Sequence, residues 1–303
     1  MGLIEKAVGE LSLTPSKPVK AARVDAIATP ARQFDIDFKA LVAQGFYVPT
    51  ARSTPLALEL RAIKRRLLRR TGFLNRTADQ RVLRQTGRHR NLIMVCSTRP
   101  SEGKTFTSIN LALSLACEEE IDVLLVDADT PRPKLRAHFG IEETPGLTDC
   151  IVDPSLNAEA LALRANQAPL SLLTEGSQVD RTGDLFASSD AQQLFTNLSS
   201  FRHDRIVVID APPVLATTEA VILARHVDEI VFVVEADSTP EPAVAAALDE
   251  LLEVNPNVSL ILNRCLLAGS RSHYGSYERY EKTPAPLSGR PEKTPAFGDK
   301  GTK

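Results

Sequence analysis

Runs of branched apolar residues alternate with amphipathic segments between residues 91 and 263. The apolar runs predict six strands, at Leu92–Ser97, Val123–Asp127, Leu170–Thr174, Arg205–Asp210, Glu229–Glu235 and Val258–Asn263. The segments between them predict helices at Lys104–Cys117, Arg132–His138, Asp184–Phe201, Thr217–Arg225 and Pro240–Val254. Most of the strands are apolar without interruption, which is typical of strands covered on both faces. The pattern therefore predicts an α/β fold in which helices pack on both faces of a mostly parallel sheet.

The pattern changes on either side of this domain, which we assign to residues 91–268. Residues 1–50 are rich in Pro, Lys, Ala and Thr and show no sustained period, so we predict a flexible N-terminal arm with one short helix at Ile4–Leu11. Residues 269–303 carry four prolines and charges of both signs without apolar runs. We predict that this second flank is a disordered tail.

A basic amphipathic helix followed by a linker is predicted inside residues 51–90. Apolar residues recur there at spacings of 4, 3 and 4, at Leu56, Leu60, Ile63 and Leu67. Ser53 and Thr54 are candidate N-caps, and Pro55 suits a first helical turn. Residues 52–90 contain 12 Arg and Lys and 2 acidic residues, so their formal net charge is +10. Because the whole chain has a formal net charge of −2, all other residues together carry −12.

Composition limits the class of protein further. A chain of 303 residues with 43% hydrophobic and 24% charged residues can bury a real core, which excludes a wholly disordered protein. The longest uncharged run has 13 residues and is too short to cross a bilayer, and the N-terminus lacks the apolar region of a secretory signal. We therefore expect a cytoplasmic protein. The four cysteines show no CxxC spacing, so we expect reduced thiols.

The first predicted strand runs into Ser97-Thr98-Arg99-Pro100-Ser101-Glu102-Gly103-Lys104-Thr105, and a helix follows at once. Backbone N–H groups at such a helix start, together with the helix dipole, bind phosphate. In that geometry Gly103 lets the backbone approach the phosphates, Lys104 bridges the outer phosphates and Thr105 binds Mg²⁺. Thr98 stands where the phosphate-loop pattern has glycine, and a surface turn is the alternative for the motif alone. The predicted nucleotide contacts are Arg99, Pro100, Ser101, Glu102, Gly103, Lys104, Thr105 and Phe106.

Aspartates end two further predicted strands. Asp127 and Asp129 close the second strand, and residues two apart on an extended chain face the same way. Asp210 follows four branched apolar residues, which is the form of a Walker-B aspartate that holds magnesium. Aspartate also ends strands as a turn former. Because the carboxyl ends of parallel strands meet at one edge, these endings together with the Gly-Lys-Thr loop favour a nucleotide site.

The order STRPSEGKT, VLLVDAD and VVIDAPP, with LLTEG between the last two, resembles the bacterial tyrosine kinases that use P-loop motifs, a branch of the MinD/ParA-like ATPases. It is most similar there to the exosortase-associated tyrosine autokinases of exopolysaccharide gene clusters, through GLIEKAV, LRAIKRRLL, NLIMV and DRIVVIDAPP. The similarity covers roughly residues 55–264, with a shorter match at 3–8. It implies a P-loop NTPase fold, ATP and Mg²⁺ as cofactors, and protein-tyrosine autokinase activity that regulates exopolysaccharide biosynthesis or export.

The resemblance also implies roles for single residues. Lys104 and Thr105 match the phosphate-binding lysine and the Mg²⁺ hydroxyl. Asp127 and Asp129 match an additional Walker motif, in which the first aspartate orients or deprotonates the acceptor tyrosine and the second supports the metal. Asp210 matches the Walker-B aspartate. The implied catalytic residues are Lys104, Asp127, Asp129 and Asp210, and the implied metal ligands are Thr105, Asp129 and Asp210.

Three positions depart from the family pattern. Ser101 stands where these kinases usually have glycine, and a residue with a Cβ resists positive φ. Arg99 occupies the position of a second lysine in MinD-type ATPases. Pro131 stands where many of the kinases have arginine.

Three of the four tyrosines, Tyr274, Tyr277 and Tyr280, fall within seven residues of the predicted tail. A disordered tail cannot use tyrosines as a core, and its flexibility suits an entry into an active site. The resemblance implies that a neighbouring protomer phosphorylates them in trans. Docking of the tail on another protein is the alternative.

The basic helix admits three interpretations. The resemblance implies contacts between protomers through a Glu-x-x-Arg-x-x-Arg pattern, but the aligned residues here are Leu58, Arg61 and Lys64, so the acid is missing. A patch for anionic lipid or another polyanion is the second. A solvated helix whose leucines pack on the sheet is the third.

The resemblance implies partners as well. They are a membrane-embedded polysaccharide chain-length determinant or co-polymerase that activates the kinase, a second copy of the chain, and a tyrosine phosphatase; no nucleic acid is expected. The kinase would then lie at the inner membrane through its partner. Two alternatives remain, a MinD/ParA-like ATPase that switches oligomeric state without phosphorylating protein, and a regulator that binds nucleotide without turnover.

Overall fold

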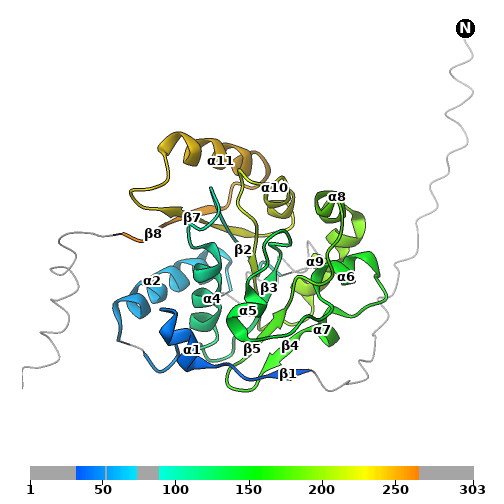
Figure 1. The fold of residues 1–303 in the computed structure, drawn as a ribbon, viewed down its shortest axis with the longest axis horizontal. Coiled ribbons are helices and arrows are strands. Elements are labelled where there is room, and N and C mark those ends of the chain that lie inside the picture. Colours follow the sequence, from blue (N-terminus) through cyan, green and yellow to red (C-terminus); the bar gives the residue numbers. More distant parts are fainter. Residues whose placement is uncertain (1–31, 52, 74–88, 266–303) are drawn as a thin grey trace, which may run out of the picture.

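The computed structural model describes residues 32–51, 53–73 and 89–265. This part contains an eight-stranded sheet in the order β1-β4-β5-β3-β6-β2-β7-β8, parallel except for the β4–β5 pair (Figure 1). The strands are β1 (Gln33–Phe34), β2 (Leu92–Ser97), β3 (Asp122–Asp127), β4 (Leu163–Ala165), β5 (Leu170–Leu173), β6 (Arg205–Asp210), β7 (Glu229–Glu235) and β8 (Val258–Asn263).

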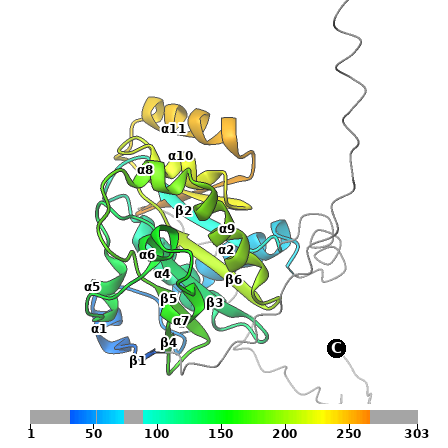
Figure 2. The ribbon, with the colours of Figure 1, turned by 90° about the vertical axis from the view of Figure 1, so that its right-hand side faces the viewer.

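Helices cover both faces of the sheet (Figure 2). One face carries α1 (Phe38–Ala43), α2 (Pro55–Arg70), α4 (Lys104–Leu115) and α5 (Leu135–Phe139). The other face carries α6 (Leu147–Val152), α7 (Ala158–Leu161), α8 (Thr182–Phe186), α9 (Ser189–Ser200), α10 (Glu219–Ala224) and α11 (Glu241–Val254). Neighbouring residues of one strand enter opposite layers, as Leu92 and Ile93 do in β2. The α/β fold with a mostly parallel sheet is confirmed.

The six predicted strands agree with the structure to within one residue at each end. The helix predicted over Asp184–Phe201 is instead two helices, α8 and α9. The break occurs at Ser188, whose hydroxyl accepts the N–H of Ala191 and so caps α9. The short elements β1, β4, α1, α6 and α7 were not predicted.

The end of the expected N-terminal arm is folded rather than flexible. Within residues 32–50, β1 pairs with β4, and α1 follows with Asp37 as its N-cap. Tyr47 is 7% exposed, and its N–H donates to Asn110 Oδ1 in α4 at 2.6 Å. This stretch therefore belongs to the domain, because it closes the apolar layer beside α4. Residues 1–31 lie outside the described residues.

The predicted amphipathic helix is α2. Thr54 caps it by accepting the N–H of Ala57, Pro55 is its first residue, and Leu60 and Leu67 are buried. Lys64 also points inward: it is 6% exposed, donates to the carbonyl of Ser114 at 2.9 Å and pairs with Glu118 at 2.5 Å. One member of the predicted protomer-contact triplet therefore binds within its own chain.

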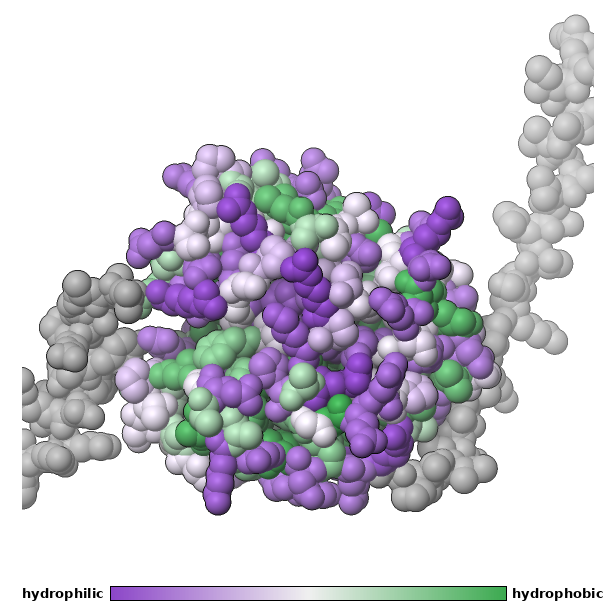
Figure 3. Space-filling view, in the orientation of Figure 1, coloured by the Kyte–Doolittle hydropathy of each residue, from purple (hydrophilic) through white to green (hydrophobic). Residues whose placement is uncertain are grey.

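No helix in the described ranges has the length and apolarity that a bilayer crossing requires. Hydrophilic side chains predominate on the face of Figure 1, and apolar ones lie between them in small groups (Figure 3). The four cysteines are free thiols. The three tail tyrosines and the linker residues 74–88 lie outside the described residues.

Candidate active site

The loop between β2 and α4 has the form of a phosphate loop. Gly103 precedes the helix with φ +99°, a left-handed conformation that favours glycine. A Cβ at this position would lie 2.1 Å from Asn263 Nδ2. The backbone conformation therefore favours glycine, and a Cβ would also displace the Asn263 amide. The helix α4 starts with its N-terminus at the carboxyl end of the sheet.

Ser101 has the left-handed backbone conformation that glycine adopts most easily. Its φ is +70°, in the left-handed region. A residue with a Cβ loses about 1–2 kcal/mol there relative to right-handed backbone. The loop therefore stores strain at a position where glycine would carry none.

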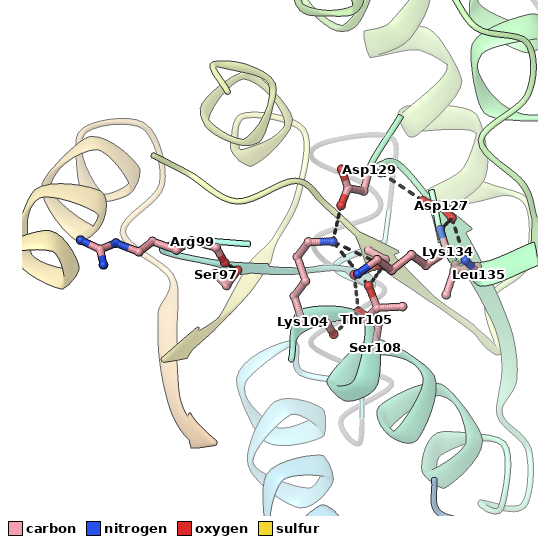
Figure 4. A network of polar contacts seen from close by, with 10 residues as sticks. Ser97, Arg99, Lys104, Thr105, Ser108, Asp127, Asp129, Lys134 and Leu135 are labelled. Carbon is pink, nitrogen blue, oxygen red and sulfur yellow. Dashed lines mark hydrogen bonds and ion pairs between the residues drawn. The ribbon is translucent and has the colours of Figure 1, made fainter. Parts of the chain in front are cut away.

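Lys104 lies between two of the predicted aspartates. Its ammonium donates to Asp129, lies 3.9 Å from Asp210 Oδ2, and is 3.4 Å from the hydroxyl of Thr105 (Figure 4). Burial opposes the charged form, but Asp210 and Asp129 outweigh this effect and raise the pKa of Lys104 above its ordinary value. The ammonium is thus charged and held at the ends of β3 and β6.

Asp210 binds two hydroxyls of α4. Thr105 Oγ1 donates to Asp210 Oδ2 at 2.7 Å, and Ser108 Oγ donates to Asp210 Oδ1 at 2.9 Å. Sequence reasoning missed Ser108, although it follows Lys104 by four residues and so lies on the same helix face. Burial raises the pKa of Asp210, and the nearby Lys104 opposes that shift.

Asp127 is opposite Asp210 in the register of β3 and β6 and is fully buried. Its carboxylate accepts three backbone N–H groups, from Asp129 at 3.1 Å, Lys134 at 3.2 Å and Leu135 at 3.0 Å. Burial, followed by the charge of Asp210, raises the pKa of Asp127 well above its ordinary value.

The side chains of the other predicted nucleotide contacts lie in different surroundings. The side chain of Arg99 is exposed and points away from Lys104 (Figure 4). The ring of Phe106 packs on Phe46, with centroids 5.1 Å apart, so its side chain belongs to the core layer. Pro100 is exposed, and Glu102 is buried at 2% exposure.

The donor set fits a nucleotide with a hard cation. Two carboxylates, Asp129 and Asp210, and the hydroxyl of Thr105 meet at one ammonium, and oxygen ligands of this kind suit Mg²⁺. No group of three or more His, Cys, Asp or Glu in the described part of the chain is arranged to hold a metal. Magnesium usually binds through one or two carboxylates together with phosphates and water, so this site suits the ion as a nucleotide complex.

No family model matches the chain. Tyrosine-protein kinase YwqD of Bacillus subtilis (strain 168) is 31% identical over 186 residues, which cover 61% of this chain and 76% of that protein. The chain belongs to the bacterial tyrosine-protein kinases. The putative tyrosine-protein kinase CapB of Staphylococcus aureus is 26% identical over 186 residues, with 61% and 80% covered. Other kinases of the family are longer: this chain spans 18% of tyrosine-protein kinase ptk of Acinetobacter johnsonii.

Two solved structures agree with this membership. The kinase domain of VpsO is 31% identical with a TM-score of 0.53, covering 67% of this chain and 98% of that one. The chimerical protein CapA2B2 is 20% identical with a TM-score of 0.57, covering 76% and 93%, and shows the same fold. The chain is thus an ATP-dependent kinase of the protein-tyrosine class with a P-loop ATPase fold.

Proposed function

We propose that this kinase transfers the γ-phosphoryl group of Mg-ATP to Tyr274, Tyr277 and Tyr280 of a neighbouring copy. The observation that carries the proposal is the convergence of Lys104 and Thr105, at the start of α4, with Asp129 and Asp210, at the ends of β3 and β6. One ammonium and two carboxylates at one point can bind a triphosphate and its cation together. The tyrosine cluster supplies acceptors in the same chain.

Positioning and charge neutralisation would supply most of the catalysis. Lys104 would orient the outer phosphates and offset the charge on the transferring group. Thr105, Asp129 and Asp210 would hold Mg²⁺, which when bound supplies further neutralisation. Asp127 would receive the proton of the acceptor hydroxyl. Its Oδ2 accepts two backbone N–H groups and its Oδ1 accepts one, so Oδ1 keeps an acceptor site for the hydroxyl.

Phosphorylation would also control the tail. Each phosphate adds about −1.5 to −2 charges to the tyrosine that carries it. Repulsion among phosphotyrosines, and between them and the aspartates of the site, would favour release of a phosphorylated tail.

We further propose that the kinase regulates exopolysaccharide biosynthesis or export in a system of the exosortase-associated type. Its partners there would be a membrane-embedded chain-length determinant as activator and a tyrosine phosphatase, with the kinase at the inner membrane. The upstream basic helix supports the subgroup. The name of the solved chimera CapA2B2, which combines CapA with CapB, supports a partner of this kind.

The proposal is tested by incubating the purified full chain with Mg-ATP and probing for phosphotyrosine. We expect signal in the wild type, none in Lys104→Met, and none in the Tyr274/Tyr277/Tyr280→Phe variant. Arg65→Met, a change at an exposed helix position, is the control and should retain the signal. Unchanged signal in Lys104→Met would refute the role of the site, and unchanged signal in the tyrosine variant would refute the acceptor.

A further inference from the structure

A buried acid inside the phosphate loop makes contacts that the phosphate-transfer chemistry does not use. Glu102 is 2% exposed, and its Oε2 accepts the N–H of Arg99 at 2.9 Å within the same loop. Its Oε1 accepts the hydroxyl of Thr239 at 2.6 Å. Thr239 lies between β7 and α11, so this hydrogen bond joins two loops at the carboxyl edge of the sheet.

A second contact reaches the loop from β8. Asn263, the last residue of β8, donates from Nδ2 to the carbonyl oxygen of Glu102 at 2.9 Å. The same amide nitrogen fills the space next to Gly103, where a Cβ would lie 2.1 Å away. Glu102 is therefore bound through its side chain by Thr239 and through its backbone by Asn263.

The contacts of Thr239 and Asn263 with Glu102 lie next to the residues of the loop whose backbone is strained. Ser101 and Gly103, on either side of Glu102, both have left-handed backbone, with φ +70° and +99°. Left-handed backbone at a non-glycine residue is unfavourable and persists only when surrounding contacts fix it. A phosphate loop must also direct its N–H groups at the ligand before the ligand arrives, since reordering the loop would reduce affinity.

The electrostatics support the same conclusion. An acid beside a triphosphate site repels the ligand, so the charge of Glu102 by itself weakens binding. Its hydrogen bonds must offset this loss. Both oxygens of Glu102 accept hydrogen bonds from Arg99 and Thr239, and such bonds to a charged acceptor are stronger than neutral ones. The acid thus acts as a double acceptor that ties the loop to its neighbour.

We propose that Thr239 and Asn263 are positioning residues that hold the phosphate loop in its nucleotide-binding conformation through Glu102. This inference rests on the proposed binding of ATP at the loop. It assigns a function to the β7–α11 loop and to the end of β8, neither of which touches Lys104 or the aspartates among the described contacts.

The test measures the affinity of the full chain for a fluorescent ATP analogue with Mg²⁺, and the Tm without nucleotide. Thr239→Val removes the hydroxyl, Thr239→Ser restores it, and Thr182→Val is a matched control, because Thr182 is also half-buried and donates to a backbone carbonyl. Losing a hydrogen bond to a charged acceptor should weaken binding by about tenfold in Thr239→Val. Thr239→Ser and Thr182→Val should bind as the wild type does.

A second variant tests the charge of Glu102 apart from its hydrogen bonds. Glu102→Gln removes the charge but keeps an acceptor for Arg99 and an amide that can donate to the Thr239 hydroxyl, so it should bind nucleotide more tightly than Glu102→Ala does. Glu102→Ala should weaken binding by at least as much as Thr239→Val. Equal affinity in the wild type, Thr239→Val and Glu102→Ala would overturn the inference and leave the proposed function intact. A wild type without nucleotide binding would overturn both.

Discussion

Ser101 is the residue of the phosphate loop whose side chain makes its backbone conformation strained. Because its φ is +70°, glycine should fit the loop better. We expect Ser101→Gly to raise the free energy of unfolding by up to about 1 kcal/mol, since relief of strain exceeds the entropy that glycine loses on folding. Urea unfolding without nucleotide measures this change.

Ser238→Gly provides the control for that prediction. Ser238 is an exposed turn residue without positive φ, so the greater freedom of glycine in the unfolded chain should lower stability by about 0.4–1 kcal/mol. Equal losses in both variants would contradict the strain at Ser101.

The buried aspartates predict how stability depends on pH. Burial raises the pKa of Asp210 above its unfolded value, so the folded protein binds more protons than the unfolded chain between about pH 4 and the folded pKa. Stability from this group therefore increases as the pH falls through that window. Without nucleotide, the wild type should gain stability relative to Asp210→Asn between pH 7 and about pH 4.

Urea unfolding of both proteins across that range is the measurement. The hydroxyls of Thr105 and Ser108 can rotate toward an amide, so Asp210→Asn should fold. A difference in stability that stays constant with pH, or shrinks as the pH falls, would contradict the raised pKa.

The sequence predicts the charged residues of the site but not the residues that support them. Asp210 ends β6, Asp129 follows the end of β3, and Lys104 starts the helix that follows β2. Because parallel strands end at one edge of the sheet, the convergence of these residues follows from the sequence pattern. Thr239 lies in the loop after β7, and Asn263 is the last residue of β8. Their contacts with Glu102 depend on side-chain rotamers, which no periodicity encodes.

At the level of elements, long apolar strands are predictable and short pieces are not. A strand buried on both faces must be apolar at every position, so its ends coincide with polar residues, as at Ser97 and Asp210 in β2 and β6. By contrast, β1 has two residues and α1 has six, too few for a period. Tertiary contacts hold both elements in place: β1 pairs with β4, and Leu41 of α1 is buried in the apolar layer that also contains α4.

The helix α2 has both a buried and an exposed basic residue, so their contributions to stability can be compared. Lys64 donates to a buried carbonyl, so Lys64→Met, which keeps the aliphatic stem, should lower the free energy of unfolding by about 1–2 kcal/mol. Arg65→Met, at an exposed position next to it, should change stability by less than about 0.5 kcal/mol. Urea unfolding of the two variants compares them, and similar losses would contradict an internal role for Lys64.

On the scale of the whole molecule, the tail and the site should belong to different copies during transfer. Lys104→Met has intact acceptors without phosphate binding, and Tyr274/Tyr277/Tyr280→Phe has an intact site without acceptors. We expect phosphotyrosine on the Lys104→Met chain only when the two variants are mixed, at a rate that rises with total concentration. Mass spectrometry of size-tagged chains locates the phosphate. A mixture without phosphotyrosine, while the wild type is phosphorylated, would show transfer within one chain.

The most direct test of the account measures phosphotyrosine and released inorganic phosphate in the same reaction of full chain and Mg-ATP. The site built by Lys104, Asp129 and Asp210 predicts phosphotyrosine in the wild type and neither product in Lys104→Met. Release of phosphate without phosphotyrosine, even with the cytoplasmic segment of a polysaccharide co-polymerase present, would contradict a tyrosine autokinase and favour an ATP-driven switch of oligomeric state.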